Sequence, residues 1–484
     1  MVDHPEALSY RDPENFAWHG GDGWFRIASG ESAAAMEAFR ASAAYESWTE
    51  RDAVVAFDEV EPEIADRVLE RARERARTIP DSARVFAVDT IDPITYPWEW
   101  PNRALAEAAR LTLDFRAALL DIGLDLKDAS AFNVQFRGRK PVFMDVGSIE
   151  FWRPNPSWNA SRQFIEHFIN PLAIGSNASV SSSDAWVASR GRGTTSDVAR
   201  SMMPARLRRR MGLLLLHATT KPREKNAPAE VHYKADSDTH RDLALKATRS
   251  LNRRLRKNID KLISGVHATT WADYGSREHY STDDLQRKRD LSVSFVDSTA
   301  DAGDLVVDIG GNDGYVAQEI ATRCGVRVAV MDADAGALDH LVADGSADNA
   351  YSKILALRGD LTNMTESSGL LGSEFSSLYE RVRPSAVLCQ AVLHHVVITQ
   401  GVPTGLAVAA LARFQAPIQI EFVLPEDDKV RQLVSQIPQW RGDYSLEALL
   451  MALRSRFTDV AEMGNTSPTR VIIEARQPRP SVSS

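Results

Sequence analysis

Cysteine is scarce in this chain of 484 residues: Cys324 and Cys389 are the only two. Both stand in apolar segments, so we expect two buried, reduced thiols and no disulfide framework. The longest aliphatic stretch, residues 213–216, is far shorter than the roughly 20 residues of a membrane span. The first residues also lack a basic patch followed by an apolar core, so no secretory signal is expected. These absences predict a cytoplasmic protein.

An excess of positive charge is also missing. The chain carries 57 Lys and Arg against 66 Asp and Glu, a net charge of −9, which argues against general nucleic-acid binding. Residues 200–261 are nevertheless basic and contain few aromatic residues. This segment is either a dock for an anionic partner or a solvated helical face. Its prominent cations are Arg206, Arg208, Arg209, Arg210, Arg253, Arg254, Arg256 and Lys257.

The length predicts two or three domains, and composition separates three regions. Residues 1–175 have a mixed α+β pattern, with a helix expected over 63–77. Residues 176–281 begin with a Ser-, Gly- and Thr-rich stretch, expected to be an exposed loop over 176–196, and continue as the basic segment with helical apolar spacing. Residues 282–484 alternate short aliphatic runs with helical segments.

The aliphatic runs of the third region predict a Rossmann-like α/β domain. Five runs indicate buried parallel strands, and two later ones are close enough to form an antiparallel hairpin. The result is a seven-stranded, mostly parallel sheet, which is the architecture of class I methyltransferases. The seven predicted strands are 305–309, 326–331, 354–357, 386–389, 418–423, 457–463 and 470–476.

A glycine-rich turn joins the first of these strands to a helix. Glycine lets the backbone approach a ligand closely, and the amino terminus of the helix favours an anionic group. Asp332 follows at the end of the second strand, where an acid can accept hydrogen bonds from ribose hydroxyls. Alternatively, Asp332 is a helix cap or turn acid.

This pattern resembles class I methyltransferases that use S-adenosylmethionine (SAM). Asp308, Gly310 and Gly314 match their first motif, while Asn312 stands where a glycine is usual and is tolerant of positive φ. By the same resemblance, Asp360 would lie near the adenine amino group. The predicted cofactor-binding residues are Asp308, Gly310, Gly311, Asn312, Gly314, Asp332, Asp360 and Gln390, with no metal ligand.

The fourth strand leads into His394 and His395, in a segment that resembles the substrate-pocket segment of methyltransferases. Either imidazole could act as general base on a substrate hydroxyl. Alternatively, one histidine packs in the core and the other orients a loop. Glu421 on the fifth strand could reach the pocket, but a charge paired inside the fold is the favoured interpretation.

Asp128, Asn133 and Asp145 in the first region have the spacing of a phosphotransferase site, in which carboxylate and amide oxygens hold magnesium. They resemble kinase-like catalytic loops, although Lys127 stands where kinases have Arg or Gly. No strand lysine with an acidic partner is evident. We therefore expect a degenerate kinase-like module. Alternatively, the two aspartates cap helices or turns.

The motifs at 96–101, 126–138, 143–150 and 162–168 together look like bacterial methyltransferases related to the nodulation protein NoeA. That resemblance covers most of the chain and implies methylation of a sugar, glycan or related biosynthetic intermediate. In these motifs Trp98, Trp100 and Phe143 could instead be core residues. Two other functions stay open: a phosphotransferase in the first region, and a non-catalytic protein that binds SAM.

A group of aromatic and basic residues precedes the first predicted strand of the third region. It could form a lid over the cofactor or serve only in packing. The group consists of Trp271, Tyr274, Tyr280, Lys288 and Arg289.

Overall fold

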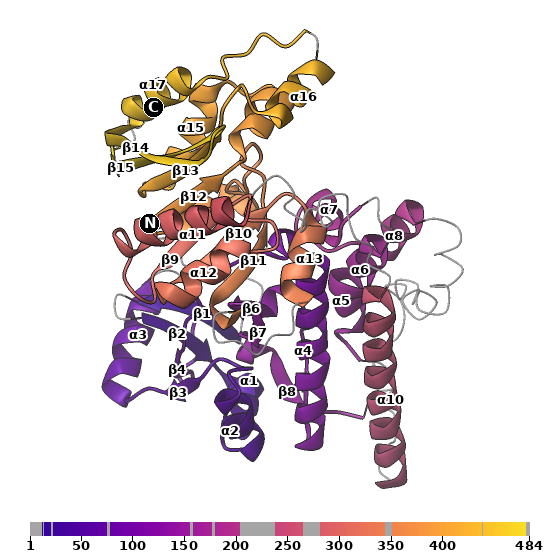
Figure 1. Cartoon of the computed structure of the whole chain (residues 1–484). Helices are drawn as coiled ribbons and strands as arrows, with labels where there is room; N and C mark the ends of the chain where they lie inside the picture. Colours follow the sequence, from indigo (N-terminus) through magenta and orange to yellow (C-terminus); the bar gives the residue numbers. More distant parts are fainter. Residues whose placement is uncertain are drawn as a thin grey trace.

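The computed structural model describes Asp12 and residues 14–20, 23–74, 78–154, 158–176, 180–203, 238–264, 281–343, 351–437 and 439–480. Its larger sheet has seven strands in the order β11-β10-β9-β12-β13-β15-β14 (Figure 1). The first five strands in this order run parallel, and β15 is antiparallel to both of its neighbours. The strands are β9 (Leu305–Ile309), β10 (Arg327–Asp332), β11 (Ile354–Arg358), β12 (Ala386–Gln390), β13 (Ile418–Val423), β14 (Phe457–Ser467) and β15 (Arg470–Pro478). All seven predicted strands are confirmed within a few residues.

Helices cover both faces of this sheet. Val306 and Val328 point to one face and pack with α11, α12 and α13. Val307 is next to Val306, and Met331 is three residues after Val328. Because side chains alternate along a strand, both point to the other face and join the core that includes α15 and α17. Burial on both faces explains why the parallel strands are continuous aliphatic runs. The helices are α11 (Thr282–Asp297), α12 (Tyr315–Arg323), α13 (Ala335–Ala343), α14 (Leu378–Arg381), α15 (Thr404–Ala412), α16 (Asp428–Gln436) and α17 (Leu446–Arg456).

The amino-terminal region contains a four-stranded antiparallel sheet in the order β1-β2-β4-β3. One face packs on α3 through Phe16, Phe25 and Val68, in a core separate from that of the larger sheet. Its elements are β1 (Asn15–Gly20), β2 (Gly23–Ala28), α1 (Gly30–Arg40), α2 (Ala43–Glu50), β3 (Phe57–Glu59), α3 (Pro62–Glu74) and β4 (Arg84–Val88). The helix predicted over 63–77 is α3.

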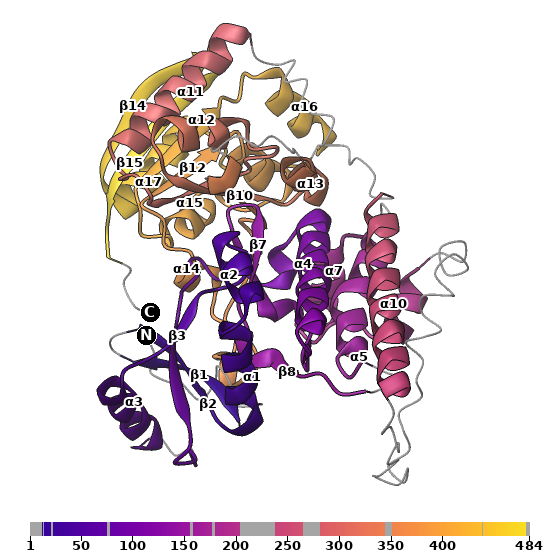
Figure 2. The same ribbon diagram turned by 90° about the horizontal axis from the view of Figure 1, so that it is seen from below.

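A helical section follows, built around the buried helix α4 (Asn102–Asp121). Two short antiparallel pairs lie beside it: β5 (Leu124–Leu126) with β8 (Ile149–Phe151), and β6 (Val134–Arg137) with β7 (Lys140–Phe143). Helix α10 packs along α4 (Figures 1 and 2). The remaining helices are α5 (Ser161–Phe164), α6 (Asn170–Gly175), α7 (Ser182–Ala188), α8 (Ser196–Met202) and α10 (Asp238–Ile263). The short 3₁₀ and π turns are η2 (Pro97–Glu99), η3 (Ala131–Asn133), η4 (Val146–Ser148), η5 (Ile165–Ile169), η7 (Tyr351–Lys353), η8 (Leu370–Gly372) and η9 (His395–Thr399).

The exposed loop expected over 176–196 is confirmed only in part: residues 189–195 form a loop, but residues 182–188 form a helix. Part of this stretch forms α7, which begins with a capping box in which Ser181 and Asp184 each bond the other's backbone. Trp186 is fully buried, and Ser182 and Ser183 are buried too. Serine-rich composition therefore marked a helix cap and a tightly packed turn rather than a solvated loop.

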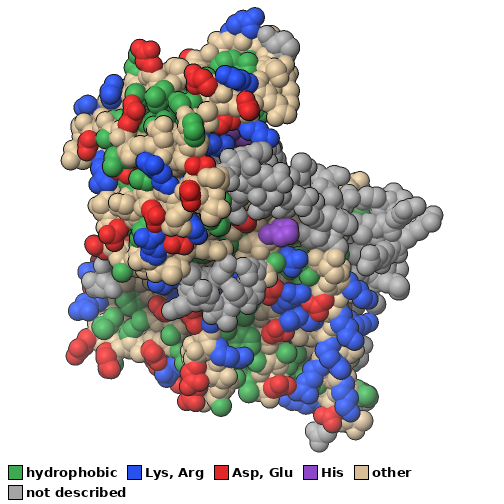
Figure 3. Space-filling model, in the orientation of Figure 1, with side chains coloured by type: hydrophobic (Ala, Val, Ile, Leu, Met, Phe, Trp, Pro, Cys, Tyr) green, Lys and Arg blue, Asp and Glu red, His purple; other side chains and the backbone are tan. Residues whose placement is uncertain are grey.

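The helix expected in the basic segment is confirmed by α10, whereas Arg206, Arg208, Arg209 and Arg210 lie outside the described residues. Arg249 pairs with Asp121 of α4 at 2.6 Å, and Arg256 pairs with Asp114 of the same helix. Arg253, Arg254 and Lys257 are exposed. Figure 3 shows Lys and Arg gathered over the surface where α10 runs. Within the described segment, the basic face is therefore used in part to dock α10 on α4.

Cys389 is buried as expected, but Cys324 is only partly buried, and both are free thiols. Among the described helices, none is long and apolar enough to cross a membrane.

Side-chain hydrogen bonds and an ion pair join the part of the chain before α10 to the seven-stranded sheet. Asp339 of α13 accepts from the backbone N–H of Arg103 at 2.7 Å and from the Asn102 amide at 2.8 Å, at the first turn of α4. Arg381 and Glu99 form a buried ion pair with N···O 2.5 Å. The two parts are thus held in one fixed arrangement.

Candidate active site

The carboxyl ends of β9, β10 and β11 meet at one edge of the large sheet, where the sequence placed the cofactor loop. β12 lies on the other side of β9, so the order of the strands reverses there. Such a switch point opens a crevice in parallel α/β sheets. Gly310 follows β9, Asp332 ends β10, and Asp360 lies just beyond β11. The structure thus brings these three predicted residues to the same edge.

The loop after β9 needs its glycines. Gly310 has φ +70°, and a Cβ there would overlap the Cγ2 of Val392. A Cβ on Gly311 would lie 2.6 Å from the Asp308 carboxylate, and one on Gly314, φ +77°, would lie 2.9 Å from Leu341. The backbone therefore runs so close to its neighbours that no larger residue fits at these three positions.

Asn312 adopts φ +51°, the conformation for which asparagine was expected to be tolerated. Its backbone N–H donates to one oxygen of Asp332 at 2.9 Å, and the N–H of Asp334 donates to the other at 2.8 Å. Burial raises the pKa of Asp332, and these two bonds oppose that shift. The loop and the acid are held together as one unit, and Asp332 keeps further lone pairs for a hydroxyl donor.

Asp308 lies fully buried beneath this loop. Burial raises its pKa to about 7, although the nearby Lys288 lowers it. Lys288 itself forms a 2.8 Å ion pair with Glu421, which also accepts from Thr466 at 2.6 Å. Glu421 is therefore paired inside the fold, as favoured from the sequence. Lys288 belongs to this buried network and does not form a lid.

Of the other lid candidates, Trp271, Tyr274 and Tyr280 lie outside the described residues. Arg289 stacks over the Tyr315 ring at 5.0 Å, at the start of α12. This contact indicates packing between α11 and α12.

Gln390 ends β12 and is buried. Its amide nitrogen donates to Ser292 of α11 at 2.6 Å and to Gln419 of β13 at 3.3 Å. Its amide nitrogen is thus held by two buried polar side chains, and its role in cofactor binding stays a prediction. Asp360 accepts from the backbone N–H and the hydroxyl of Thr362, both at 2.8 Å, and remains partly exposed.

His394 and His395 follow β12 at the start of η9, with ring centroids 4.1 Å apart. Burial, with the nearby His395 and Arg470, lowers the pKa of His394 to about 2. Burial also lowers the pKa of His395, which is less enclosed. Both rings are therefore unprotonated at neutral pH, and His395 is the more accessible of the two bases.

A known protein is similar to this chain over most of its length. No family model matches the chain. The nodulation protein NoeA of Rhizobium meliloti (strain 1021) is 28% identical over 465 residues, which cover 93% of this chain and 91% of NoeA. The chain is similar to NoeA along nearly its whole length.

Solved structures match a smaller share of the chain. Magnesium protoporphyrin IX methyltransferase from Synechocystis PCC 6803 with bound SAM matches 44% of this chain and 86% of its own, at 18% identity and a TM-score of 0.29. A TehB-like SAM-dependent methyltransferase from Corynebacterium glutamicum matches 40% of this chain and 96% of its own, at 14% identity and a TM-score of 0.26.

Asp128, Asn133 and Asp145 line one large cavity, of about 2040 Å³, to which the amino-terminal part of the chain and residues 363–375 both contribute. The Asn133 amide donates to the Asp128 carboxylate at 3.1 Å. Burial raises the pKa of Asp128, with Asp145 adding to the shift. The structure therefore brings together all three residues that the spacing selected.

Sequence reasoning missed two partners of this cluster. Arg26 of β2 pairs with Asp145 at 2.5 Å, and Ser130 lies 3.1 Å from the ring of His167. Arg26 lies on a strand, and only a strand lysine was sought, so a strand arginine was the available signal. His167 is 37 residues from Ser130, and no local pattern links them.

Proposed function

We propose that residues 282–484 form a SAM-dependent methyltransferase domain, preceded by the two amino-terminal regions 1–175 and 176–281. The observation that carries the proposal is the contact between the glycine loop and Asp332 at the switch point of the sheet. A positive-φ loop that opens a helix, tied to a carboxylate at the end of the next strand, fits the carboxylate end and the ribose of SAM.

The acceptor is an oxygen of a sugar, a glycan or a related biosynthetic intermediate. This class rests on the likeness to NoeA-related methyltransferases. SAM supplies an electrophilic methyl group, and the protein's task is to align the acceptor in a pocket that excludes water. Asp332 would hold the ribose and Asp360 would lie near the adenine. His395, unprotonated at neutral pH, would accept the proton of the acceptor hydroxyl.

Calorimetric titration of SAM into the wild type and Asp332→Ala tests the proposal. Loss of charge-assisted hydrogen bonds should weaken binding by about 1–3 kcal/mol. Asp283→Ala is the control, because Asp283 is an exposed acid in the first turn of α11. No binding of SAM to the folded wild type would contradict the proposal, and binding without methyl transfer to any acceptor would favour a non-catalytic protein.

A second candidate function is phosphotransfer in the amino-terminal part, favoured by the convergence of Asp128, Asn133 and Asp145 in one cavity. Their oxygens are of the kind that magnesium prefers. The fit is partial, because Arg26 already neutralises Asp145, and no cluster of three His, Cys, Asp or Glu residues that could hold a metal occurs in the described chain.

Magnesium-dependent ATP turnover by the purified protein, lost in Asp145→Asn, would support this second function. Asp81→Asn is the control, because Asp81 is fully exposed and lies outside the cavity. Absence of turnover in the wild type would leave the cluster as a degenerate site.

A further inference from the structure

The large cavity lined by Asp128, Asn133 and Asp145 has an aromatic wall to which both parts of the chain contribute. Trp98 and Phe132 come from the region before α7, and Phe375 comes from the segment after β11 of the large sheet. The Phe375 ring lies 5.4 Å from Phe132, nearly parallel to it, and 5.2 Å from Trp98, edge to face. All three rings are only partly buried, so parts of their surfaces face the cavity.

Hydrogen bonds and the ion pair fix the position of this wall. The Tyr96 hydroxyl accepts from the backbone N–H of Ser376 at 2.9 Å, next to Phe375. The Arg381 guanidinium lies 4.0 Å from the centre of the Tyr96 ring and is paired with Glu99. Phe375 is therefore held in place before any ligand arrives, which reduces the entropy lost on binding.

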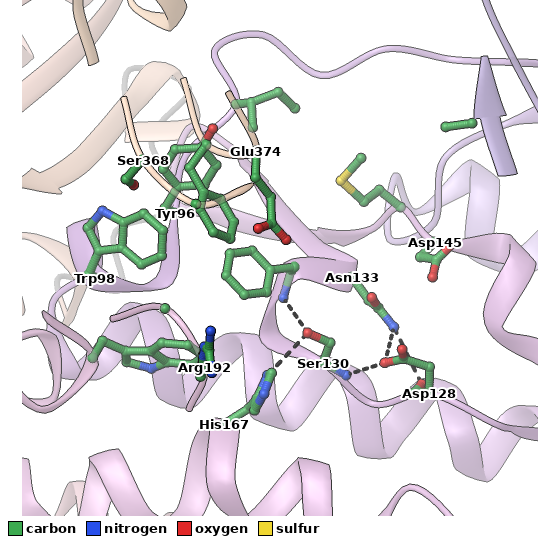
Figure 4. A pocket seen from close by; sticks show the side chains of 18 of the residues that line it. Tyr96, Trp98, Asp128, Ser130, Asn133, Asp145, His167, Arg192, Ser368 and Glu374 are labelled. Atoms are coloured by element: carbon green, nitrogen blue, oxygen red, sulfur yellow. Dashed lines mark hydrogen bonds between the residues drawn. The ribbon is translucent and has the colours of Figure 1, made fainter. Parts of the chain in front are cut away.

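Polar groups stand opposite the aromatic rings (Figure 4). Asp128 accepts from the backbone N–H of Ser130 at 2.8 Å as well as from Asn133, so its carboxylate is fixed. Burial lowers the pKa of His167 to about 4, so at neutral pH its ring can accept from the Ser130 hydroxyl. Glu374, half-buried, adds a carboxylate from the segment after β11, and Arg192 adds donors to the lining. The cavity thus combines flat apolar surfaces with rigid hydrogen-bond acceptors.

We propose that this cavity is a carbohydrate-binding site, completed by the 368–375 segment of the methyltransferase domain. One face of a pyranose ring carries weakly positive C–H groups, which fit the negative faces of aromatic rings. Its hydroxyls are donors for Asp128 and Glu374, and bonds to charged acceptors are strong.

The site is separate from the SAM crevice. Among the residues proposed to bind SAM or act as base, none lines the cavity. The inference therefore goes beyond methyl transfer and does not depend on it.

Saturation-transfer NMR on the full-length protein tests the site. The probes are the methyl β-glycosides of glucose and galactose, with adenosine as a non-sugar ring. We expect saturation of at least one glycoside, unchanged by excess S-adenosylhomocysteine, and about tenfold weaker binding in Phe375→Leu and Trp98→Leu. Phe375→Tyr, which restores an aromatic face, should restore binding.

Tyr379→Leu is the matched control, because Tyr379 packs on Phe414 in the same domain and does not line the cavity. Thermal melts establish that each variant is folded. Absence of glycoside binding to the wild type would overturn the proposal. An equal loss of glycoside binding in Phe375→Leu and Tyr379→Leu would also overturn it. Saturation of adenosine but of neither glycoside would overturn it as well. If glycoside binding were lost in Asp332→Ala but kept in Phe375→Leu, the sugar would bind in the SAM crevice and not in this cavity.

Discussion

At the scale of single residues, Gly310 is the tightest point of the cofactor loop. Its φ of +70° strains any other residue, and an added Cβ would also overlap Val392. Positive φ costs an L-residue about 1–2 kcal/mol, and overpacking typically adds about 1–3 kcal/mol. We expect Gly310→Ala to lower the free energy of unfolding by the sum and to abolish SAM binding, as measured by urea denaturation and calorimetry.

The variant Gly303→Ala separates the cost of positive φ from the cost of steric overlap. Gly303 also has positive φ, at +91°, but nothing lies within 4 Å of its added Cβ. It should therefore show the backbone cost alone and leave SAM binding unchanged. Equal effects of both alanines would mean that contact with Val392 does not shape the loop. The double variant Gly310→Ala/Val392→Ala should recover part of the lost stability.

The contrast between Asn312 and Gln390 shows where sequence reasoning stops for single residues. The positive φ of Asn312 follows from its place in a short loop between a strand and a helix, which is local information. Gln390 and Lys288 have partners 98 and 133 residues away along the chain in Ser292 and Glu421. No spacing rule links such distant residues, so their buried network was found only in the structure.

Lys288→Met should destabilise the protein strongly. The variant leaves the Glu421 carboxylate buried without its cation, which typically costs about 3–5 kcal/mol. In the wild type, burial raises the pKa of Glu421 but Lys288 outweighs it, so the net shift is downward. Glu421 then contributes stability at high pH, which is lost as the pH falls. Without Lys288 the pKa of Glu421 should rise, so its contribution should be lost as the pH rises.

The difference in unfolding free energy between wild type and Lys288→Met should therefore be larger at pH 7.5 than at pH 5. Urea denaturation at the two pH values measures it. The double variant Lys288→Met/Glu421→Leu, which removes both charges, should recover most of the loss. A pH-independent difference would exclude the ion pair as its cause.

At the scale of elements, the amino terminus of α4 is capped by another helix. Pro101 precedes α4 and offers no side-chain cap, while Asp339 of α13 accepts from Arg103 N–H and the Asn102 amide. A carboxylate at this position also interacts favourably with the helix dipole. Burial raises the pKa of Asp339 to about 6, although these hydrogen bonds oppose the shift.

Asp339→Ala should therefore have a pH-dependent cost. A folded-state pKa above the unfolded value means that Asp339 contributes most stability at low pH and loses part of it as the pH rises through about 6. We expect the loss of unfolding free energy in Asp339→Ala to be about 1–1.5 kcal/mol larger at pH 5 than at pH 7.5. The control is Asp283→Ala, and the opposite pH trend would contradict the assigned pKa shift.

Elements with a strong local signal were predicted well, and those that depend on tertiary contacts were not. The strands of the large sheet are aliphatic because both faces are covered, and that pattern is visible in any short window. Helix α7 has only a few apolar residues among serines. Its burial depends on Trp98, whose backbone carbonyl accepts from Ser183. That contact spans 85 residues, so composition alone suggested a loop.

At the scale of the whole molecule, the Arg381–Glu99 pair joins the two parts of the chain at a buried position. Arg381 also donates to the backbone carbonyl of Ile94 and stacks on Tyr96. Loss of Arg381 leaves a buried carboxylate unpaired, a cost of about 3–5 kcal/mol. We expect calorimetry to show one cooperative transition for the wild type and two separated transitions for Arg381→Met.

Arg413→Met is the matched control for this effect. Arg413 pairs with Glu366 at 2.7 Å and stacks on Tyr379 at 4.0 Å, so it makes the same types of contact as Arg381. All its partners, however, belong to the large-sheet part, and its ion pair is exposed. Arg413→Met should therefore lower the free energy of unfolding by at most about 1 kcal/mol and leave a single transition. If Arg381→Met also unfolds in one step, cooperativity between the two parts depends on their other contacts, with Asp339 and its bonds to α4 as the next to remove.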